Sequence, residues 1–254
     1  AVSSARHTVV LEKGGSVTLI GGRMDATVNR ELHQGLLTQD AAQARQSARS
    51  QEKEGAQILL LKTGVAGLDE SKSLRQVLET LSPTTRSPIL IDAEKVETVE
   101  RALRFYPGRL MVRIAGTEAA ALLPVVAKYG AIPVLPMPTP AAIPANRTAV
   151  RQAVADARIH GFARGEVVID CTPQTLNAEA LRSSLGMISW CEQSLGCRTF
   201  LDLTGFGKDL PEPCWVQAFL LAAAQASGLT MALADPSVAE TMKIRAAGDR
   251  FRVT

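Results

Sequence analysis

The chain has 254 residues, of which 46% are hydrophobic and 21% are charged, so a packed globular core is expected. The formal net charge is only +3 and the basic residues are scattered, which argues against a nucleic-acid binder, because such proteins concentrate Lys and Arg in one patch. No apolar run approaches the roughly 20 residues that a membrane helix needs, and no secretory signal opens the sequence, so we expect a cytoplasmic protein that does not enter a membrane.

Apolar runs rich in β-branched residues recur along the chain, and each is followed by a segment of helical periodicity. Continuous apolar runs are typical of strands that are buried on both faces. The intervening segments are long enough for crossover helices, and glycines end two of them, Gly55 after residues 38–54 and Gly196 after residues 177–195. The predicted strands are residues 16–22, 56–64, 87–93, 108–116, 131–137, 166–172, 198–205 and 229–235.

Eight strand–helix units within this length predict an α/β fold of one domain, a (β/α)8 or TIM barrel. A doubly wound open sheet is the alternative, although it would normally use fewer strands. We expect residues 1–15 to form a partly ordered lead-in and residues 16–254 to form the barrel. The four cysteines do not have the paired spacing of metal ligands. We expect them to be reduced thiols, as in a cytoplasmic protein.

Polar residues at the strand ends are the candidate site, because a barrel of this type carries its chemistry on the loops that follow the strands. Asp92 ends the third predicted strand and Asp170 ends the sixth. We expect both carboxylates to face one cavity mouth, since a closed sheet brings its strand ends together. The other strand-end residues are Arg23, Asp25, Lys62, Thr63, Arg113, Met137, Asp202, Thr204 and Asp235.

Two carboxylates in such a mouth could share a proton, hold a hard cation, or accept hydrogen bonds from a heterocycle with adjacent N–H donors. A metal site needs further oxygen or nitrogen ligands, and no histidine stands at a strand end, so no bound metal is expected. Lys62 and Arg113 are instead cationic partners for the carboxylates. The plainer alternative is that Asp92 and Asp170 pair with these cations only to close the top of the barrel.

The order of the elements resembles the pterin-binding barrel family, and within it most closely the methyltetrahydrofolate–corrinoid protein methyltransferases. The resemblance runs from about Val17 to Met242, and its best stretches are LIGGRMDATVNREL, QEKEGAQILLLKTG, ILIDAEKVETVERAL, AIPVLPM and EVVIDCTP. In that family, aspartates at the ends of the third and sixth strands hold the pterin ring, and Asp92 and Asp170 match them. The other matching residues are Gly21, Arg23, Gln51, Gly55, Ala56 and Gly64.

The sequence departs from the family pattern at several polar positions. Arg113 replaces the asparagine of the fourth strand, and a guanidinium has only donors, so it cannot copy an amide that both donates and accepts. If the chain is catalytic, we expect Arg113 to turn away from the ring and to be neutralised by Asp92 or Asp25. If Arg113 instead points into the cavity, it would compete for the carboxylates and favour an anionic ligand. The remaining departures are Gly22 and Asp25 in the opening signature, Leu60 and Lys62 in the second strand, and Thr204 with Gly205 at the seventh-strand asparagine.

The resemblance implies an enzyme that transfers a methyl group between methyltetrahydrofolate and a corrinoid carried by a partner protein. It implies a homodimer, no metal of the chain's own, and a pterin as substrate. The catalytic residues would be Asp170 and Thr204, and the substrate-binding residues would be Asp92, Asp170, Arg113, Asp25, Lys62, Met137 and Asp202.

Two alternatives remain open. The first is a non-catalytic relative that binds a ligand or a partner protein. The second, ranked last, is a dihydropteroate synthase. That family normally carries basic residues in the loops after the last two strands, where this chain offers only Lys208.

Overall fold

The computed structural model describes residues 1–137, 143–175 and 177–251. Eight parallel strands form a closed barrel in the order β10, β3, β4, β5, β6, β7, β8 and β9. Each lies within one predicted apolar run, and the predicted (β/α)8 barrel is confirmed. The chain divides into two compact units. Unit 1 comprises residues 1–10 and 20–133, and unit 2 comprises residues 11–19 and 134–254.

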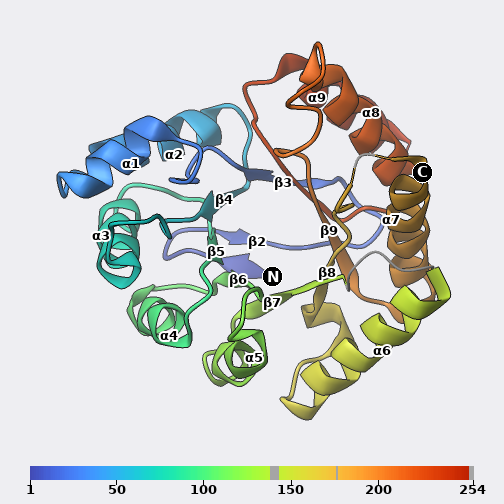
Figure 1. The fold of residues 1–254 in the computed structure, drawn as a ribbon, viewed down its shortest axis with the longest axis horizontal. Coiled ribbons are helices and arrows are strands. Elements are labelled where there is room, and N and C mark those ends of the chain that lie inside the picture. Colours follow the sequence, from blue (N-terminus) through green and yellow to red (C-terminus); the bar gives the residue numbers. More distant parts are fainter. Residues whose placement is uncertain (138–142, 176, 252–254) are drawn as a thin grey trace. The chain divides into compact units, whose positions relative to one another are not determined.

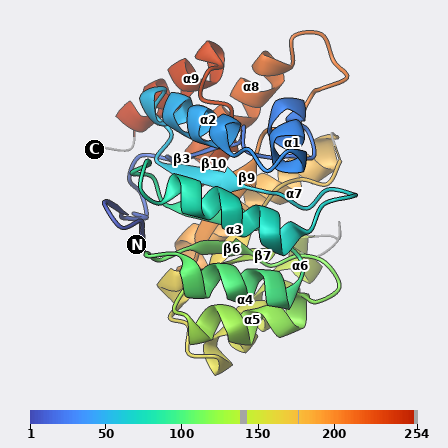
Figure 2. The same cartoon turned by 90° about the vertical axis from the view of Figure 1, so that its left-hand side faces the viewer.

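Unit 1, blue to green in Figure 1, follows the strand–helix alternation that the sequence predicts. Strands β3, β4 and β5 are wholly buried, as their continuous apolar sequences require. Helices α3, α4 and α5 lie side by side in Figure 2. The elements are β3 (Thr18–Gly21), α1 (Arg30–Leu37), α2 (Ala42–Lys53), β4 (Ile58–Leu61), α3 (Glu70–Leu81), β5 (Ile89–Asp92), α4 (Val96–Phe105), β6 (Met111–Arg113), α5 (Ala119–Lys128) and the start of β7 (Ile132–Pro136).

The first ten residues form a small hairpin that sequence reasoning missed. Strands β1 (Val2–Ser3) and β2 (Thr8–Val9) pair antiparallel, and the side chain of Val2 is fully buried. The backbones of Ser3 and Arg109 exchange two hydrogen bonds, of 3.0 and 2.9 Å. A Cβ atom at Gly108 would lie 2.3 Å from the Ser3 carbonyl oxygen, so this close approach needs glycine there. The start of the predicted lead-in is therefore an integral part of unit 1.

Unit 2, yellow-green to red in Figure 1, contains the remaining helices and strands of the barrel. The predicted helix before Gly196 ends in one turn of π-helix, η2 (Cys191–Leu195), and Gly196 stops it with a φ of 75°. The other elements are α6 (Ile143–Ile159), η1 (Arg164–Glu166), β8 (Val168–Asp170), α7 (Ala178–Trp190), β9 (Arg198–Asp202), α8 (Pro213–Ala226), β10 (Met231–Ala234) and α9 (Ala239–Arg250).

Within residues 1–137, 143–175 and 177–251, no helix combines the length and the hydropathy that crossing a bilayer requires.

Candidate functional site

In unit 1, the strand ends place one buried carboxylate between two cations. Asp92 is only 6% exposed, and its Oδ2 lies 3.2 Å from Lys62 Nζ and 3.4 Å from Arg113 Nη1. The register of β5 and β6 places Asp92 directly beside Arg113. The expectation that Arg113 is neutralised by Asp92 or Asp25 is confirmed for Asp92. The negative charge of Asp92 thus already has cationic partners within the protein.

The backbones of Asp25 and Lys62 are paired. A parallel bridge joins the two residues, with hydrogen bonds from Ala26 N to Lys62 O and from Lys62 N to Met24 O. The side chain of Asp25 is held locally, because its Oδ1 accepts from the backbone N and the hydroxyl of Thr27, at 2.8 and 2.6 Å. Four predicted site residues of unit 1 therefore come together at neighbouring strand ends, namely Asp25, Lys62, Asp92 and Arg113.

Gly21, Arg23 and Gln51, which match the family signature, are explained by packing. Gln51 is fully buried, and its Oε1 accepts a hydrogen bond of 3.0 Å from Arg23 N. A Cβ atom at Gly21 would lie 2.4 Å from that same oxygen. The guanidinium of Arg23 pairs with Glu54 at the end of α2. These residues thus fasten the loop after β3 to α2.

Glu70, the first residue of α3, is a half-buried acid near the same strand ends and was missed by sequence reasoning. Burial raises its pKa, and the positive charge of Lys95 opposes this while Glu94 and Asp92 add to it. A Cβ atom at Gly64 would lie 2.5 Å from Glu70 Oε1, so the glycine after β4 makes room for the carboxyl group. The only sequence signal was its place beside Asp69, which caps α3 by accepting from Lys72 N.

In unit 2, the strand-end aspartates are held by turns of one kind. Asp170 is 7% exposed, and its Oδ1 accepts from the backbone N and the hydroxyl of Thr172. Asp202 Oδ1 accepts from the backbone N and the hydroxyl of Thr204, at 2.9 and 2.6 Å. The same pattern joins Asp235 to Ser237 after β10. Each aspartate is therefore oriented by the residue two positions later.

Neighbouring strands fix the backbone of Asp170. The backbone N of Met137, which follows β7, donates to the Asp170 carbonyl oxygen at 3.1 Å. The hydroxyl of Thr172 accepts a hydrogen bond of 2.9 Å from Asp202 N on β9. Four predicted site residues of unit 2 thus come together, namely Met137, Asp170, Asp202 and Thr204. That Asp92 and Asp170 face one cavity stays a prediction.

Three cysteines of unit 2, Cys171, Cys191 and Cys197, are buried free thiols. A hydrogen bond from Cys191 and burial raise the pKa of Cys171, and burial raises the pKa of Cys197 to about 11. Both groups are therefore neutral near pH 7 and unsuited to act as nucleophiles or metal ligands. Across the described part of the chain, no group of three or more His, Cys, Asp or Glu side chains is arranged to hold a metal ion.

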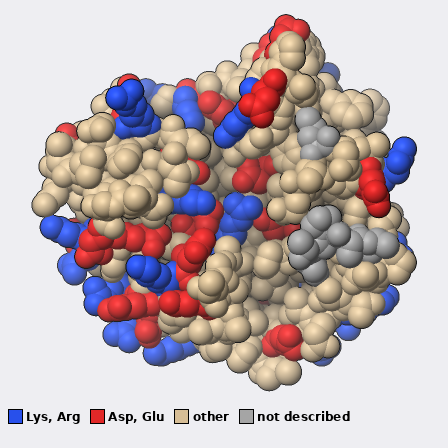
Figure 3. All heavy atoms as spheres, in the orientation of Figure 1, with Lys and Arg blue, Asp and Glu red and all other residues tan. Residues whose placement is uncertain are grey.

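A groove with a volume of about 640 Å³ lies between α3 and α4 in unit 1. Figure 3 shows charged side chains of both signs crowded over these helices, at the lower left. The arginines pair with glutamates one turn away, as in Arg75 with Glu79 and Arg104 with Glu100. Hydrogen bonds from Lys128, Arg104 and Tyr129 lower the pKa of Glu100 to about 2. This arrangement is typical of solvated helix faces.

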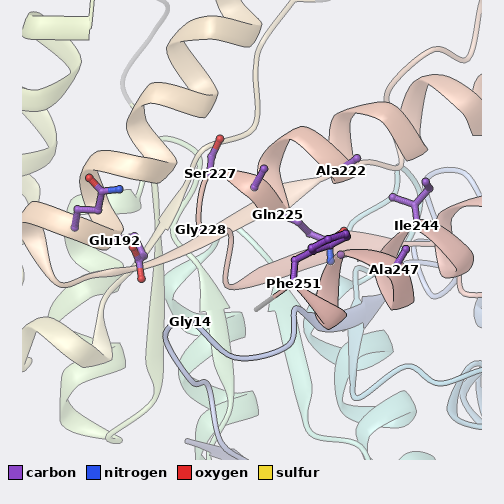
Figure 4. A pocket seen from close by; sticks show the side chains of 12 residues that line it. Gly14, Glu192, Ala222, Gln225, Ser227, Gly228, Ile244, Ala247 and Phe251 are labelled. Atoms are coloured by element: carbon purple, nitrogen blue, oxygen red, sulfur yellow. The ribbon is translucent and has the colours of Figure 1, made fainter. Parts of the chain in front are cut away.

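A cavity of about 520 Å³ lies in unit 2, between α8 and α9. Figure 4 shows Gln225 of α8 and Phe251 after α9 close together, with Ala222 and Ala247 nearby. Two of its lining residues, Glu192 and Gly228, precede β9 and β10, whereas the strand-end aspartates follow those strands. In this barrel fold the chemistry belongs to the carboxyl ends of the strands. The cavity is therefore separate from the candidate site.

Three of the similar solved structures are dihydropteroate synthases. The enzyme from Clostridium difficile, in the presence of pteroic acid, has a TM-score of 0.72 and 18% identity over 94% of this chain and 98% of its own. The enzyme from Stenotrophomonas maltophilia has a TM-score of 0.73 and 19% identity, covering 97% of this chain and 96% of its own. The enzyme from Yersinia pestis has a TM-score of 0.73 and 14% identity, covering 100% of this chain and 99% of its own. At these identities the likeness establishes the fold.

Sequence comparison identifies the family more directly than fold. No curated protein matches the sequence. The sequence pattern of the family described as "pterin binding enzyme" matches residues 21–194, which is more than half of the chain and includes both Asp92 and Asp170. The expected resemblance to the pterin-binding barrel family is confirmed, and the chain belongs to the pterin-binding enzymes.

Proposed function

We propose that the chain binds a reduced pterin and transfers its methyl group to a corrinoid carried by a partner protein. The observation that carries the proposal is Asp170, a strand-end carboxylate at the position of a family aspartate, held in one orientation by Thr172. The amino group and ring N–H of a pterin are donors, and an ionised carboxylate only accepts. Charge-assisted hydrogen bonds of this kind are short and strong, and they fix the ring.

In the transfer, the bond between the methyl carbon and the pterin nitrogen would break, and the partner's corrinoid, as cobalt(I), would supply the electron pair for the new bond to that carbon. The nitrogen keeps the electron pair of that bond and gains a proton. The asparagine that the family places near this nitrogen falls at about Gly205, and Thr204 lies beside it. The hydroxyl of Thr204 donates to Asp202 Oδ1, so we assign Thr204 and Asp202 to orienting that side of the ring. Met137, which follows β7 and whose backbone N donates to Asp170 O, would pack against the ring.

A second candidate function is favoured by the surroundings of Asp92. Lys62 and Arg113 both approach one oxygen, Oδ2, at 3.2 and 3.4 Å. These distances exceed the roughly 2.7–2.9 Å of strong charge-assisted hydrogen bonds. The side chain of Lys62 is 33% exposed. Its accessible charge attracts an acidic substituent and opposes N–H donors, which suits a retuned, non-catalytic relative that binds an anionic ligand.

Dihydropteroate synthesis is the third candidate, because the similar structures carry that activity in their names. Their likeness supports only the fold at 14–19% identity. In the loops after β9 and β10, residues 203–212 contain Lys208 as their single basic residue, and residues 235–238 contain none. A diphosphate leaving group needs cationic partners, so we rank this activity behind methyl transfer.

The proposal includes two protein partners, a corrinoid protein and a second copy of the chain. Helix α8 exposes Trp215 (56%) and Phe219 (64%). Beside them lies an apolar groove of about 250 Å³, lined by Pro173, Ala178, Leu181, Val216 and Leu220 among others. Protruding aromatic side chains next to an apolar groove suit a two-fold contact, in which each copy fills the groove of the other. Sedimentation velocity tests this, and Phe219→Ser is expected to yield monomers.

Calorimetric titration with methyltetrahydrofolate tests the proposed function. We expect saturable binding, loss of about tenfold or more in affinity for Asp170→Asn, and little change for Asp235→Asn, which removes the charge from the same type of turn on β10. Transfer of the methyl group to free cob(I)alamin, followed by absorbance, then separates the first candidate from the second. Formation of dihydropteroate from dihydropterin diphosphate and p-aminobenzoate would establish the third. A folded protein that binds no pterin would overturn the proposal.

A further inference from the structure

The side chain of Thr172, in the turn after β8, forms hydrogen bonds with residues of two strands, β8 and β9. Its hydroxyl oxygen accepts a hydrogen bond from Asp202 N at 2.9 Å, and its hydroxyl proton is donated to Asp170 Oδ1. The backbone N of Thr172 donates to the same oxygen at 3.0 Å. Among the hydrogen bonds of the described residues, the corresponding hydroxyls of Thr27, Thr204 and Ser237 each donate only to their own aspartate. The double role of Thr172 distinguishes the Asp170 turn from the other three.

The direction of the Thr172 hydroxyl proton follows from these partners. A backbone N–H can only donate, so the amide of Asp202 fixes the Thr172 oxygen as its acceptor. The hydroxyl has one proton, and that proton goes to Asp170 Oδ1. With the backbone N–H of Thr172, two donors then occupy the two lone pairs of this carboxylate oxygen. Thr172 therefore fixes the Oδ1 end of the Asp170 carboxylate.

We propose that Thr172 is a positioning residue for Asp170, which holds the carboxylate in one orientation through two hydrogen bonds to Oδ1 and so presents it to the donors of the ligand. The assignment rests on the proposed function, because the ligand donors are those of a reduced pterin. Thr172 acts through Asp170. Its contact with Asp202 N also makes the orientation of Asp170 depend on the neighbouring strand β9.

The first test is calorimetric titration of the full chain with tetrahydrofolate. Thr172→Val keeps the shape of the side chain but removes both hydroxyl hydrogen bonds, and we expect affinity to fall about tenfold. Thr172→Ser restores the hydroxyl and is expected to bind within about twofold of the wild type. Ser237→Ala removes the matching hydroxyl from the Asp235 turn and is expected to leave affinity unchanged. Wild-type affinity in folded Thr172→Val, or no rescue by Thr172→Ser, would overturn the proposal.

A second readout separates positioning from packing. Hydrogen bonds to a carboxylate favour its charged form, so their loss in Thr172→Val raises the pH at which acidification abolishes tetrahydrofolate binding. Thr172→Ser should return this midpoint to the wild-type value. A packing role alone would change affinity at every pH and leave the midpoint where it is. Thr172→Ala replaces the valine variant in both titrations if thermal melting shows that Thr172→Val does not fold.

The proposal and the proposed function can fail separately. If the wild type binds no tetrahydrofolate, the proposed function is wrong, and the role of Thr172 is then tested without ligand. Carbon NMR of the aspartate carboxyl groups, assigned with Asp170→Asn, gives the pKa of Asp170 directly. We expect that pKa to be higher in Thr172→Val than in the wild type and in Thr172→Ser. Equal values in all three would show that Thr172 does not control Asp170.

Discussion

Arg113 lies directly beside Asp92 in the register of β5 and β6, and its Nη1 is 3.4 Å from Asp92 Oδ2. A buried carboxylate that binds a guanidinium is a weaker acceptor for ligand N–H groups, because part of its charge is already compensated. Asp92 contacts Lys62, which follows β4, and Arg113 of β6, and Asp170 is oriented by Thr172.

Replacement of Arg113 by asparagine should strengthen pterin binding. Asp92 would keep Lys62 as its partner, and the family's amide would be restored at the fourth strand. We expect the affinity for tetrahydrofolate to rise about threefold to tenfold, measured by calorimetry. The control is Arg101→Asn on α4, where the arginine is exposed and pairs with Glu97. A fall in affinity for Arg113→Asn alone would show that Arg113 contacts the ligand, as in a pocket built for an acidic group.

Gly21→Ala should destabilise the protein. The added Cβ would lie 2.4 Å from Gln51 Oε1, and overpacking of a buried site typically costs about 1–3 kcal/mol. Urea denaturation measures the loss. In a Gln51→Ala background, where the obstructing atom is gone, the same substitution should cost far less, since residues in contact are not additive. If Gly21→Ala lowered the free energy of unfolding equally in both backgrounds, contact with Gln51 would not be the reason that glycine is needed, and the backbone conformation of Gly21 would be the cause.

Glu70→Gln should stabilise the protein near neutral pH. The pKa of Glu70 is raised in the folded state, chiefly by burial, so the folded protein binds its proton more tightly than the unfolded chain does. Ionisation of Glu70 therefore opposes folding, and stability falls as pH rises from the unfolded pKa through the folded one. We expect the Tm of Glu70→Gln to exceed that of the wild type at pH 7 and the difference to vanish below about pH 4.

Alkylation of the native protein at pH 8 should modify Cys214 alone. Cys214 is partly exposed, whereas Cys171, Cys191 and Cys197 are buried. Because the pKa values of Cys171 and Cys197 are raised, few of these thiols are ionised at that pH. Intact-mass spectrometry counts the adducts, and all four thiols should react in denaturant. Early reaction at Cys171 would mean that the turn after β8 opens readily.

The strands and their ends were predictable because burial on both faces leaves a continuous apolar run, and because polar residues stand where each run stops. Asp92, Asp170 and Asp202 are examples. The hairpin of residues 1–10 was missed because its strands are two residues long and are fixed by Arg109, a hundred positions away. Short strands with distant partners leave no periodic signal in the sequence.

The finer features of the site depend on contacts that only folding creates. The raised pKa of Glu70 arises from burial and from charges on other loops, so its sequence neighbours do not reveal it. The spacing Asp-x-Thr or Asp-x-Ser is visible after β8, β9 and β10, but the same spacing forms many ordinary turns. The second hydrogen bond of Thr172 needs Asp202 on the next strand. Sequence alone could name the aspartates but could not tell how each one is held.

The aspartate turns also bear on how the strand ends can change during evolution. Asp202 and Asp235 obtain their orientation from residues two positions later, so a mutation at one of these ends leaves the other intact. The Asp170 turn contacts β9 through the backbone amide of Asp202, which every residue except proline supplies. Asp92 instead contacts the side chains of Lys62 and Arg113, which follow or belong to other strands. A lasting change at Asp92 therefore requires coupled substitutions at Lys62 or Arg113, whereas the turn hydrogen bonds of Asp202 and Asp235 lie within three consecutive residues.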